Sequence, residues 1–471
     1  MNQNTDRHYN SIAYLKSKLV SVAFTKLLPF IFLFIITILY ANKLTKYEYG
    51  QFQSIWVYSN ILCVVLNFGF SSTLLSSNFD EFMSFIKKNK TFISFSYFFL
   101  LVIAACGLLY SSGLNRNITM LLLLYITFQV IGMLYDALLI KLDRLKIYTG
   151  INLFYSILFF GVHLFFYCYS YSLRNLIFSL ALVSFIKLIT FSFLKIRVNY
   201  SETNFSNIII SKNWLFIASA TIIGILSMWL DKLYLQLKMP PDQFAVFFNG
   251  AIEVPFFGII IGAVETILLR GISVSLHNKK DVVNLFKESI KLISAVAFPV
   301  FCFFLVFHFE TFSLIFQNKY NESVPIFFIY IFLIPLRVTH FGVILQCYGK
   351  AHIVTLGAFG DGVLSLFLMF VLYPRFGTQG VAFALVFSTY LQALFYLYKS
   401  SQLLKVGVPD LLPVNHLLKV LLFNGTLFTI FLILKKCIPT YHSFFASLSL
   451  MCSVIIFFIY RYWSSTKKIN P

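Results

Sequence analysis

The sequence predicts an all-α integral membrane protein with about 14 transmembrane helices, and three observations lead to this prediction. The chain of 471 residues is 59% hydrophobic and only 11% charged, and its mean hydropathy is +0.83. Apolar runs of about 20 residues, each long enough to span a bilayer as a helix, recur along its whole length. Basic residues gather in the short loops between these runs, as in multi-pass proteins. No room remains for a soluble domain.

The apolar runs divide the chain into fourteen expected spans. They are residues 17–41, 52–77, 91–112, 117–140, 148–171, 174–195, 213–236, 244–270, 289–309, 323–347, 352–373, 378–398, 413–434 and 442–463. The eighth is long, so a tilt or a break is expected there. The first run is too long for a signal-peptide core and follows a polar stretch of about 15 residues, which argues against a cleaved leader.

The basic residues alternate between the two sides of the membrane. The side that takes the N-terminus, the even-to-odd loops and the C-terminus holds roughly 24 Lys and Arg residues, and the other side roughly 10. Because cytoplasmic loops carry the excess, both termini are expected in the cytoplasm. A missed or an invented span would invert the bias, so the alternation supports the count. It also explains the net charge of +20 without a nucleic-acid partner.

The chain carries signs of an internal duplication. The turn at 43–56 resembles the turn at 236–250, and the inner turn at 142–154 resembles 347–359, both at an offset of roughly 200 residues. Two six-helix bundles related by a pseudo-two-fold axis along the membrane normal are therefore expected, at 1–205 and 206–400, followed by two additional spans at 401–471. The alternative is that any two membrane hairpins look alike.

Ionisable residues in the middle of spans are the candidate functional residues. Each costs about 2.5–3.5 kcal/mol at a helix centre, so they should face one another or a wet cavity. The cations are Lys26, Lys187, Arg337 and, near a span end, Arg270. The acids are Asp136, Asp231, Glu253, Glu265 and Asp361. A cationic lumen would suit a phosphate-bearing anion, and the acids could bind a coupling H⁺ or Na⁺.

Plainer alternatives remain open for several of these residues. Lys187 lies near the inner end of its span, where its ammonium could simply reach the interface. Asp136 and Asp231 also lie near span ends. Glu265 and Arg270 are five residues apart and could pair, or Arg270 could be only an anchor at the inner surface.

Three prolines stand beside three of the deepest charges. Pro29 follows Lys26 by three residues, Pro255 follows Glu253 by two, and Pro335 precedes Arg337 by two. A proline inside a helix removes a backbone hydrogen bond and bends the helix. Such breaks are tolerated at membrane depth where the backbone lines a cavity. Hinged helices around an aqueous lumen are expected, although prolines are common in membrane helices generally.

Four segments together resemble one transporter family. They are KLTKYEYGQF (43–52), SLIFQNKYNESVPIF (313–327), GKAHIVTLG (349–357) and YPRFGTQGVAFALVFSTY (373–390). In this order and spacing the chain resembles the polysaccharide repeat-unit flippases of the Wzx type. Their superfamily, the multidrug/oligosaccharidyl-lipid/polysaccharide (MOP) exporters, also contains the MATE exporters and the lipid II flippases. The likeness covers nearly the whole chain.

The resemblance implies a transporter of a bacterial inner membrane. It would move undecaprenyl-pyrophosphate-linked O-antigen or capsular repeat units to the outer leaflet by alternating access. Lys26 and Arg337 would face the pyrophosphate, and Pro29 would let the first span bend as a gate. Implied partners are the lipid-linked oligosaccharide, membrane lipids, and the polysaccharide polymerase with its chain-length machinery. No cofactor is expected beyond a coupling ion.

Two rival functions are weighed against the flippase. A MATE-like exporter of organic cations would need acids in the first bundle's cavity, whereas the first span offers Lys26 and no carboxylate. A membrane glycosyltransferase or polysaccharide polymerase would need an outer catalytic loop, often with paired acids that bind a metal. The chain has no D-x-D motif and only short outer loops. We therefore expect a transporter and not an enzyme.

Overall fold

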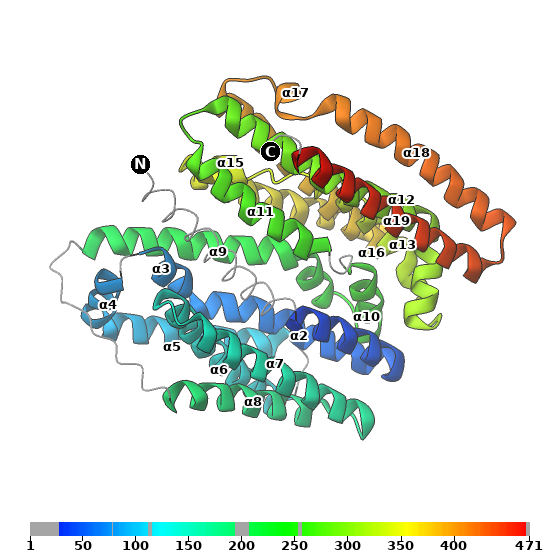
Figure 1. Cartoon of the computed structure of the whole chain (residues 1–471). Helices are drawn as coiled ribbons and strands as arrows, with labels where there is room; N and C mark the ends of the chain where they lie inside the picture. The colour runs from blue at the N-terminus through cyan, green and yellow to red at the C-terminus, as the bar shows by residue number, and fades with distance from the viewer. Residues whose placement is uncertain (1–27, 78, 112–114, 194–206, 253–256, 468–471) are drawn as a thin grey trace. The chain divides into compact units, whose positions relative to one another are not determined.

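The structure, a computed structural model, describes residues 28–467 except 78, 112–114, 194–206 and 253–256 (Figure 1). Three candidate residues, Lys26, Glu253 and Pro255, lie outside this part. The structure is 89% helical, and its described residues form no strand. The predicted all-α membrane fold is therefore confirmed.

The chain forms two compact units. The first takes Met1–Trp229 and Gln236–Gln243, and the second takes Leu230–Leu235 and Phe244–Pro471. The first unit contains the helix Leu28–Lys43 and then α2 (Lys46–Asn67), α3 (Phe70–Ser76), α4 (Phe79–Lys88), α5 (Lys90–Ser111), α6 (Arg116–Lys141), α7 (Leu145–Cys168) and α8 (Leu173–Phe193). The next helix, α9 (Asn207–Gln236), contributes residues to both units.

The second unit carries the remaining helices. They are α10 (Pro241–Gly250), α11 (Phe257–Val274), α12 (Lys279–Phe316), the 3₁₀ turn η1 (Asn321–Ser323), α13 (Val324–Ile331), α14 (Leu333–Leu336), α15 (Val343–Cys347), α16 (Ala351–Leu404), α17 (Val408–Leu411), α18 (Val414–Cys437) and α19 (Thr440–Lys467). The first residues of α10 still belong to the first unit.

The described residues contain nine helices that are long and apolar enough to cross a membrane, or ten if the bent pair α2 and α3 counts as one span. The 54-residue α16 contains a break at Gly377, whose φ of 56° and ψ of −140° are not helical. This break falls between the expected spans 352–373 and 378–398. The chain is thus a multi-pass membrane protein, and the count of fourteen stays a prediction.

In the first unit, the break between α2 and α3 is fixed by α9. The helix α2 ends at Phe68 with a left-handed φ of 46°, and Gly69 follows with a φ of 71°. The indole nitrogen of Trp214 donates a hydrogen bond of 2.9 Å to the Phe68 carbonyl oxygen. A Cβ on Gly69 would lie 2.7 Å from the Cα of Ala218 on α9. The start of α9 therefore packs directly on the 52° bend between α2 and α3.

In the second unit, the tenth expected span (323–347) is broken into α13, α14 and α15. The residues between Leu336 and Val343 form no helix, and this stretch begins just after Pro335. Backbone without helical hydrogen bonds is tolerated at membrane depth only where protein or water surrounds it. The break therefore marks a place in this unit that lipid does not cover.

Candidate functional site

The described candidate residues fall into two groups, one in each unit. Asp136 and Lys187 lie in the first unit, and Asp231, Glu265, Arg337 and Asp361 lie in the second. The side chain of Arg270 lies outside the part that the structure describes, as do Lys26 and Glu253. Among the described residues, no three His, Cys, Asp or Glu side chains gather as metal ligands.

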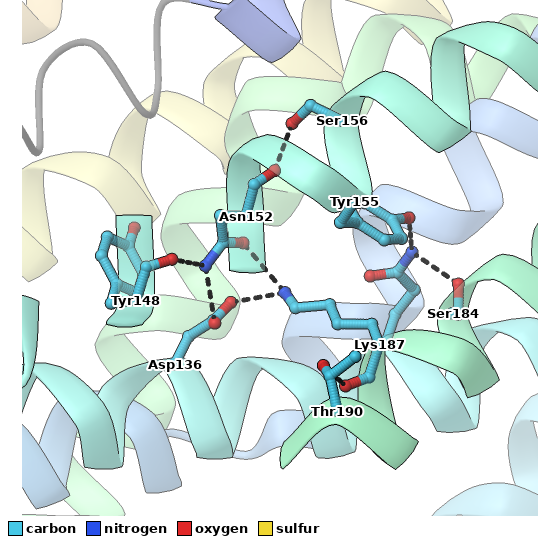
Figure 2. A network of polar contacts seen from close by, with 9 residues as sticks. Asp136, Tyr148, Asn152, Tyr155, Ser156, Ser184, Lys187 and Thr190 are labelled. Atoms are coloured by element: carbon cyan, nitrogen blue, oxygen red, sulfur yellow. Dashed lines mark hydrogen bonds and ion pairs between the residues drawn. The ribbon is translucent and has the colours of Figure 1, made fainter. Parts of the chain in front are cut away.

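Asp136 and Lys187 form an ion pair inside the first unit (Figure 2). The Lys187 ammonium lies 2.8 Å from Asp136 Oδ2 and also donates to Asn152 Oδ1 at 3.0 Å. Asn152 Nδ2 in turn donates to Asp136 Oδ1 at 2.9 Å. The three residues come from α8, α6 and α7, so one closed triangle of hydrogen bonds joins three helices.

The triangle is shielded from its surroundings. The Lys187 side chain is only 8% exposed and that of Asp136 only 20%. The ammonium also lies 5.1 Å from the centre of the Tyr155 ring, where a cation is attracted to the ring face. A buried charge is costly unless it is paired and hydrogen-bonded. In this triangle both the Lys187 ammonium and the Asp136 carboxylate are paired and hydrogen-bonded.

A second set of polar side chains continues the network. Gln129 Nε2 donates to the Tyr155 hydroxyl and, at 3.2 Å, to Ser184 Oγ. The hydroxyl of Ser184 itself donates to the Leu180 carbonyl at 2.8 Å. Sequence reasoning did not single out these residues or Asn152. Uncharged polar residues are common in membrane helices, so residue type alone does not single them out.

Asp231 is also fully buried and paired. Its Oδ2 accepts a hydrogen bond from the Tyr330 hydroxyl and lies 3.2 Å from the Lys232 ammonium. Its Oδ1 has no hydrogen-bond partner among the described residues. Asp231 therefore combines a neutralising partner with one open carboxylate oxygen in the second unit.

Glu265 lies within electrostatic range of Arg337, at the broken tenth span. Glu265 is half-buried on α11, and Arg337, whose side chain is exposed, follows the last residue of α14. The positive charge of Arg337 acts electrostatically on the Glu265 carboxylate. An exposed guanidinium at membrane depth is too costly to face lipid, so it must face water or a polar ligand. Arg337 is thus an exposed cation near the middle of an expected span, whereas the exposed Arg174 and Lys419 lie nearer the ends of theirs.

Asp361 lies at the interface of the two halves of α16. It is half-buried and lies near Ser388, which comes from beyond the break at Gly377 and is fully buried. Its Oδ1 has no hydrogen-bond partner among the described residues. Like Asp231, it could accept a cation or a proton.

The prolines differ in their surroundings. Pro29 is the second described residue of the helix Leu28–Lys43 and is exposed. Pro335 lies within α14, directly before the non-helical stretch, where the sequence led us to expect a bend. Pro255 lies outside the described residues. Their role as gating hinges stays a prediction.

Comparison with known proteins shows what this architecture is similar to. No protein-family model matches the chain, and no curated protein matches it. Among solved structures it is similar to the lipid II flippase MurJ in an inward closed conformation, with a TM-score of 0.70 and 13% identity over 95% of this chain and 99% of that chain.

Two further solved structures are similar over less of the chain. An inward-facing MATE family transporter of the MOP superfamily matches with a TM-score of 0.60 and 13% identity, over 82% of this chain and 98% of that chain. A MOP superfamily transporter from Pyrococcus furiosus matches with a TM-score of 0.56 and 13% identity, over 83% of this chain and 96% of that chain. The chain thus shares its fold with these transporters, and the prediction of a fold like theirs is confirmed. The polysaccharide branch stays a prediction.

Proposed function

We propose that the chain is a flippase that carries undecaprenyl-pyrophosphate-linked O-antigen or capsular repeat units across a bacterial inner membrane. It would work by alternating access, from the cytoplasmic to the periplasmic leaflet, with both termini in the cytoplasm. The observation that carries the proposal is the extent of the structural likeness. A lipid II flippase matches 95% of this chain, whereas MATE transporters match 82–83%. A lipid-linked substrate is therefore the better-supported class.

Arg337 is the residue that we assign to the anionic headgroup. A guanidinium binds phosphate oxygens through two parallel hydrogen bonds, and its charge does not depend on pH. Glu265 beside it would partly balance this charge when no substrate is present, and a pyrophosphate would compete with that carboxylate. Lys26 and Arg270 stay in the proposal as further cations. Lys187 does not, because Asp136 already neutralises it within the first unit.

Two acids are the best candidates for ion coupling. Asp231 and Asp361 each have one carboxylate oxygen without a hydrogen-bond partner among the described residues. An open, buried carboxylate oxygen lowers the cost of binding H⁺ or Na⁺, because the ion supplies the missing partner. Glu253, Glu265 and Asp136 were also expected to serve. We rank them lower, since Asp136 is held in the triangle with Lys187 and Asn152, and neither Asp136 nor Glu265 has a buried carboxylate oxygen without a hydrogen-bond partner among the described residues.

The rival function is export of organic cations, and the likeness to MATE transporters favours it. In that case an acid and not Arg337 would contact the substrate. The two functions differ in the sign of the charge that the site requires, so substitution of Arg337 separates them.

The test uses a strain that lacks the gene and carries plasmid copies of the chain. Lipids are extracted and the lipid-linked repeat units are measured beside the surface polymer. We expect repeat units to accumulate and polymer to disappear in the deletion strain, and Arg337→Ala to reproduce both at normal protein level. Arg337→Lys should restore only part of the transport, since a point charge replaces the fork.

The matched control is Arg375→Ala, which removes an exposed arginine near the break in α16. We expect it to leave the polymer unchanged. Unchanged polymer in the deletion strain, together with retention of cationic drugs, would overturn the flippase proposal in favour of an exporter. Surface display of single, unpolymerised units would instead indicate a polymerase.

A further inference from the structure

The 38-residue helix α12 of the second unit bends where no proline explains it. In α12 the bend lies at Phe307, whose φ of −111° and ψ of 23° are not helical, and the proline of this helix, Pro299, lies eight residues earlier. Sharp bends have identifiable causes, one of which is a side chain inserted into the ladder of backbone hydrogen bonds. The bend in α12 therefore calls for a local partner.

Lys435, in the last turn of α18, supplies that partner. Its ammonium donates a hydrogen bond of 2.8 Å to the carbonyl oxygen of Val306, the residue just before the bend. In an uninterrupted α-helix this carbonyl would accept from the amide of Glu310, four residues on. The Lys435 ammonium thus competes with the Glu310 amide for the Val306 carbonyl oxygen, at the point where α12 changes direction.

The same ammonium makes two further contacts around the bend. It lies 2.7 Å from Glu310 Oε1, on a residue that is only 8% exposed, and 5.4 Å from the centre of the Phe307 ring. The hydroxyl of Thr311 donates to the Phe307 carbonyl at 2.7 Å, so the next carbonyl also has a side-chain partner. A buried carboxylate without a cation would be costly, which makes Lys435 the natural partner of Glu310.

The helix α18 lies along α12 in fixed register, so Lys435 is held at this height. His416 Nε2 lies 3.1 Å from Ser294 Oγ near the start of α18, and the Cys302 thiol donates to the Asn424 carbonyl at 3.5 Å in its middle. The contacts follow the same order along α12 and α18, so the two helices run parallel. Phe431 of α18 and Phe444 of α19 also contact the Phe307 ring, at centroid distances of 6.3 and 5.8 Å.

The bend faces the broken span that carries Arg337. Beyond the bend, Phe312 contacts Phe327 of α13 at a centroid distance of 4.9 Å, and before it Phe304 contacts the same ring at 5.6 Å. The helix α13 therefore packs on both sides of the bend, and α14 and Arg337 follow it directly. A change in the angle of α12 would displace the start of this broken span.

We propose that Lys435 is a positioning residue for transport. By bonding the Val306 carbonyl and the Glu310 carboxylate, it holds the bend of α12 and so the placement of the broken span with Arg337. The two C-terminal helices, α18 and α19, would then help to set the geometry around Arg337. This inference rests on the proposed role of Arg337 in substrate binding.

The experiment compares substitutions on neighbouring lysines. Lys435→Met removes the ammonium and keeps an unbranched stem, and Lys436→Met, in the same turn but exposed, is the matched control. Spin labels at the exposed positions Phe309 and Leu422, in a chain without its seven cysteines, report the distance between α12 beyond the bend and α18. Surface polymer and lipid-linked units are measured in parallel.

We expect Lys435→Met to shift or broaden the distance distribution and to lower transport by about 2- to 30-fold, the range of coupling effects from residues that touch no ligand. Lys435→Arg, which keeps a charged donor, should restore both. The exchange Glu310→Lys with Lys435→Glu should restore neither, because a carboxylate cannot donate to the Val306 carbonyl. If Lys435→Met is too unstable to purify, Glu310→Gln, which removes only the charge of the acid, takes its place.

Two results would overturn the inference. One is a wild-type distance distribution in Lys435→Met, which would show that the bend does not depend on the ammonium. The other is an altered distance with wild-type transport, which would show that the bend does not position the site. Failure of the proposed function would give a different result. Arg337→Ala would then transport normally, while Lys435→Met would still change the distance distribution.

Discussion

Replacement of Lys187 by Met provides the sharpest test of the buried ion pair. Methionine keeps the unbranched apolar stem and removes only the ammonium. The Asp136 carboxylate, 20% exposed, would then remain inside the first unit with Asn152 as its hydrogen-bond donor. Because its charge would have no cation within the triangle, we expect the free energy of unfolding to fall.

The size of this loss follows from the geometry. Removal of one partner from a buried pair costs about 3–5 kcal/mol. We expect the lower end, about 3 kcal/mol, because the bond from Asn152 persists and the carboxylate is partly exposed. The double variant Asp136→Asn with Lys187→Met leaves no charge behind, and replacement of a whole buried pair is often neutral. It should therefore be more stable than Lys187→Met alone.

Unfolding in mixed detergent micelles, followed by circular dichroism, measures both free energies. Lys146→Met on α7 is the control, since this lysine is exposed. If Lys187→Met lowers the free energy of unfolding by less than about 1 kcal/mol, the range of exposed ion pairs, the pair does not stabilise the fold as a buried pair would. If the stable double variant fails to transport, Lys187 returns to the list of substrate-binding cations.

Three further predictions concern packing and ion coupling. Trp214→Phe keeps an aromatic ring but removes the donor to the Phe68 carbonyl, so it should cost about 1–3 kcal/mol of unfolding free energy in the same detergent assay. Gly50→Ala should cost more, because its Cβ would lie 1.8 Å from a backbone oxygen, whereas Gly107→Ala, which meets nothing within 4 Å, should be neutral or stabilising by up to about 1 kcal/mol. Asp361→Asn should abolish the dependence of transport on the coupling ion, measured as repeat-unit export at varied pH and Na⁺ concentration.

The turns and the fold class could be predicted from the sequence because both depend on local properties. Long apolar runs have few alternatives to helices in a membrane, where every backbone group needs an internal partner. The break at Gly377 falls between two expected spans, although the helix is otherwise continuous there. The interruption after Pro335 lies where the proline led us to expect a bend.

The partners of the charged residues could be predicted only in part. Asp136 and Asn152 stand at similar distances from the inner turn at 142–144, so an antiparallel helix pair brings them together, and this signal was available in the sequence. The pairing with Lys187 was not, because it joins the fourth and sixth expected spans. Nothing in a uniformly apolar helix fixes its rotation about its own axis or its choice of neighbour.

The same limit explains why the sequence treats Lys187 and Arg337 alike while the structure divides them. Lys187 and Lys435 each lie against a carboxylate that is itself largely buried, so each charge is neutralised by an acid of the protein itself. Arg337 differs, because its side chain is exposed beside a half-buried acid in a stretch without helical backbone. A charge of the first kind stabilises one arrangement of helices. A charge of the second kind can exchange its partner for a substrate, and so exposure at membrane depth separates the cation that we expect to bind from those that we expect to hold the fold.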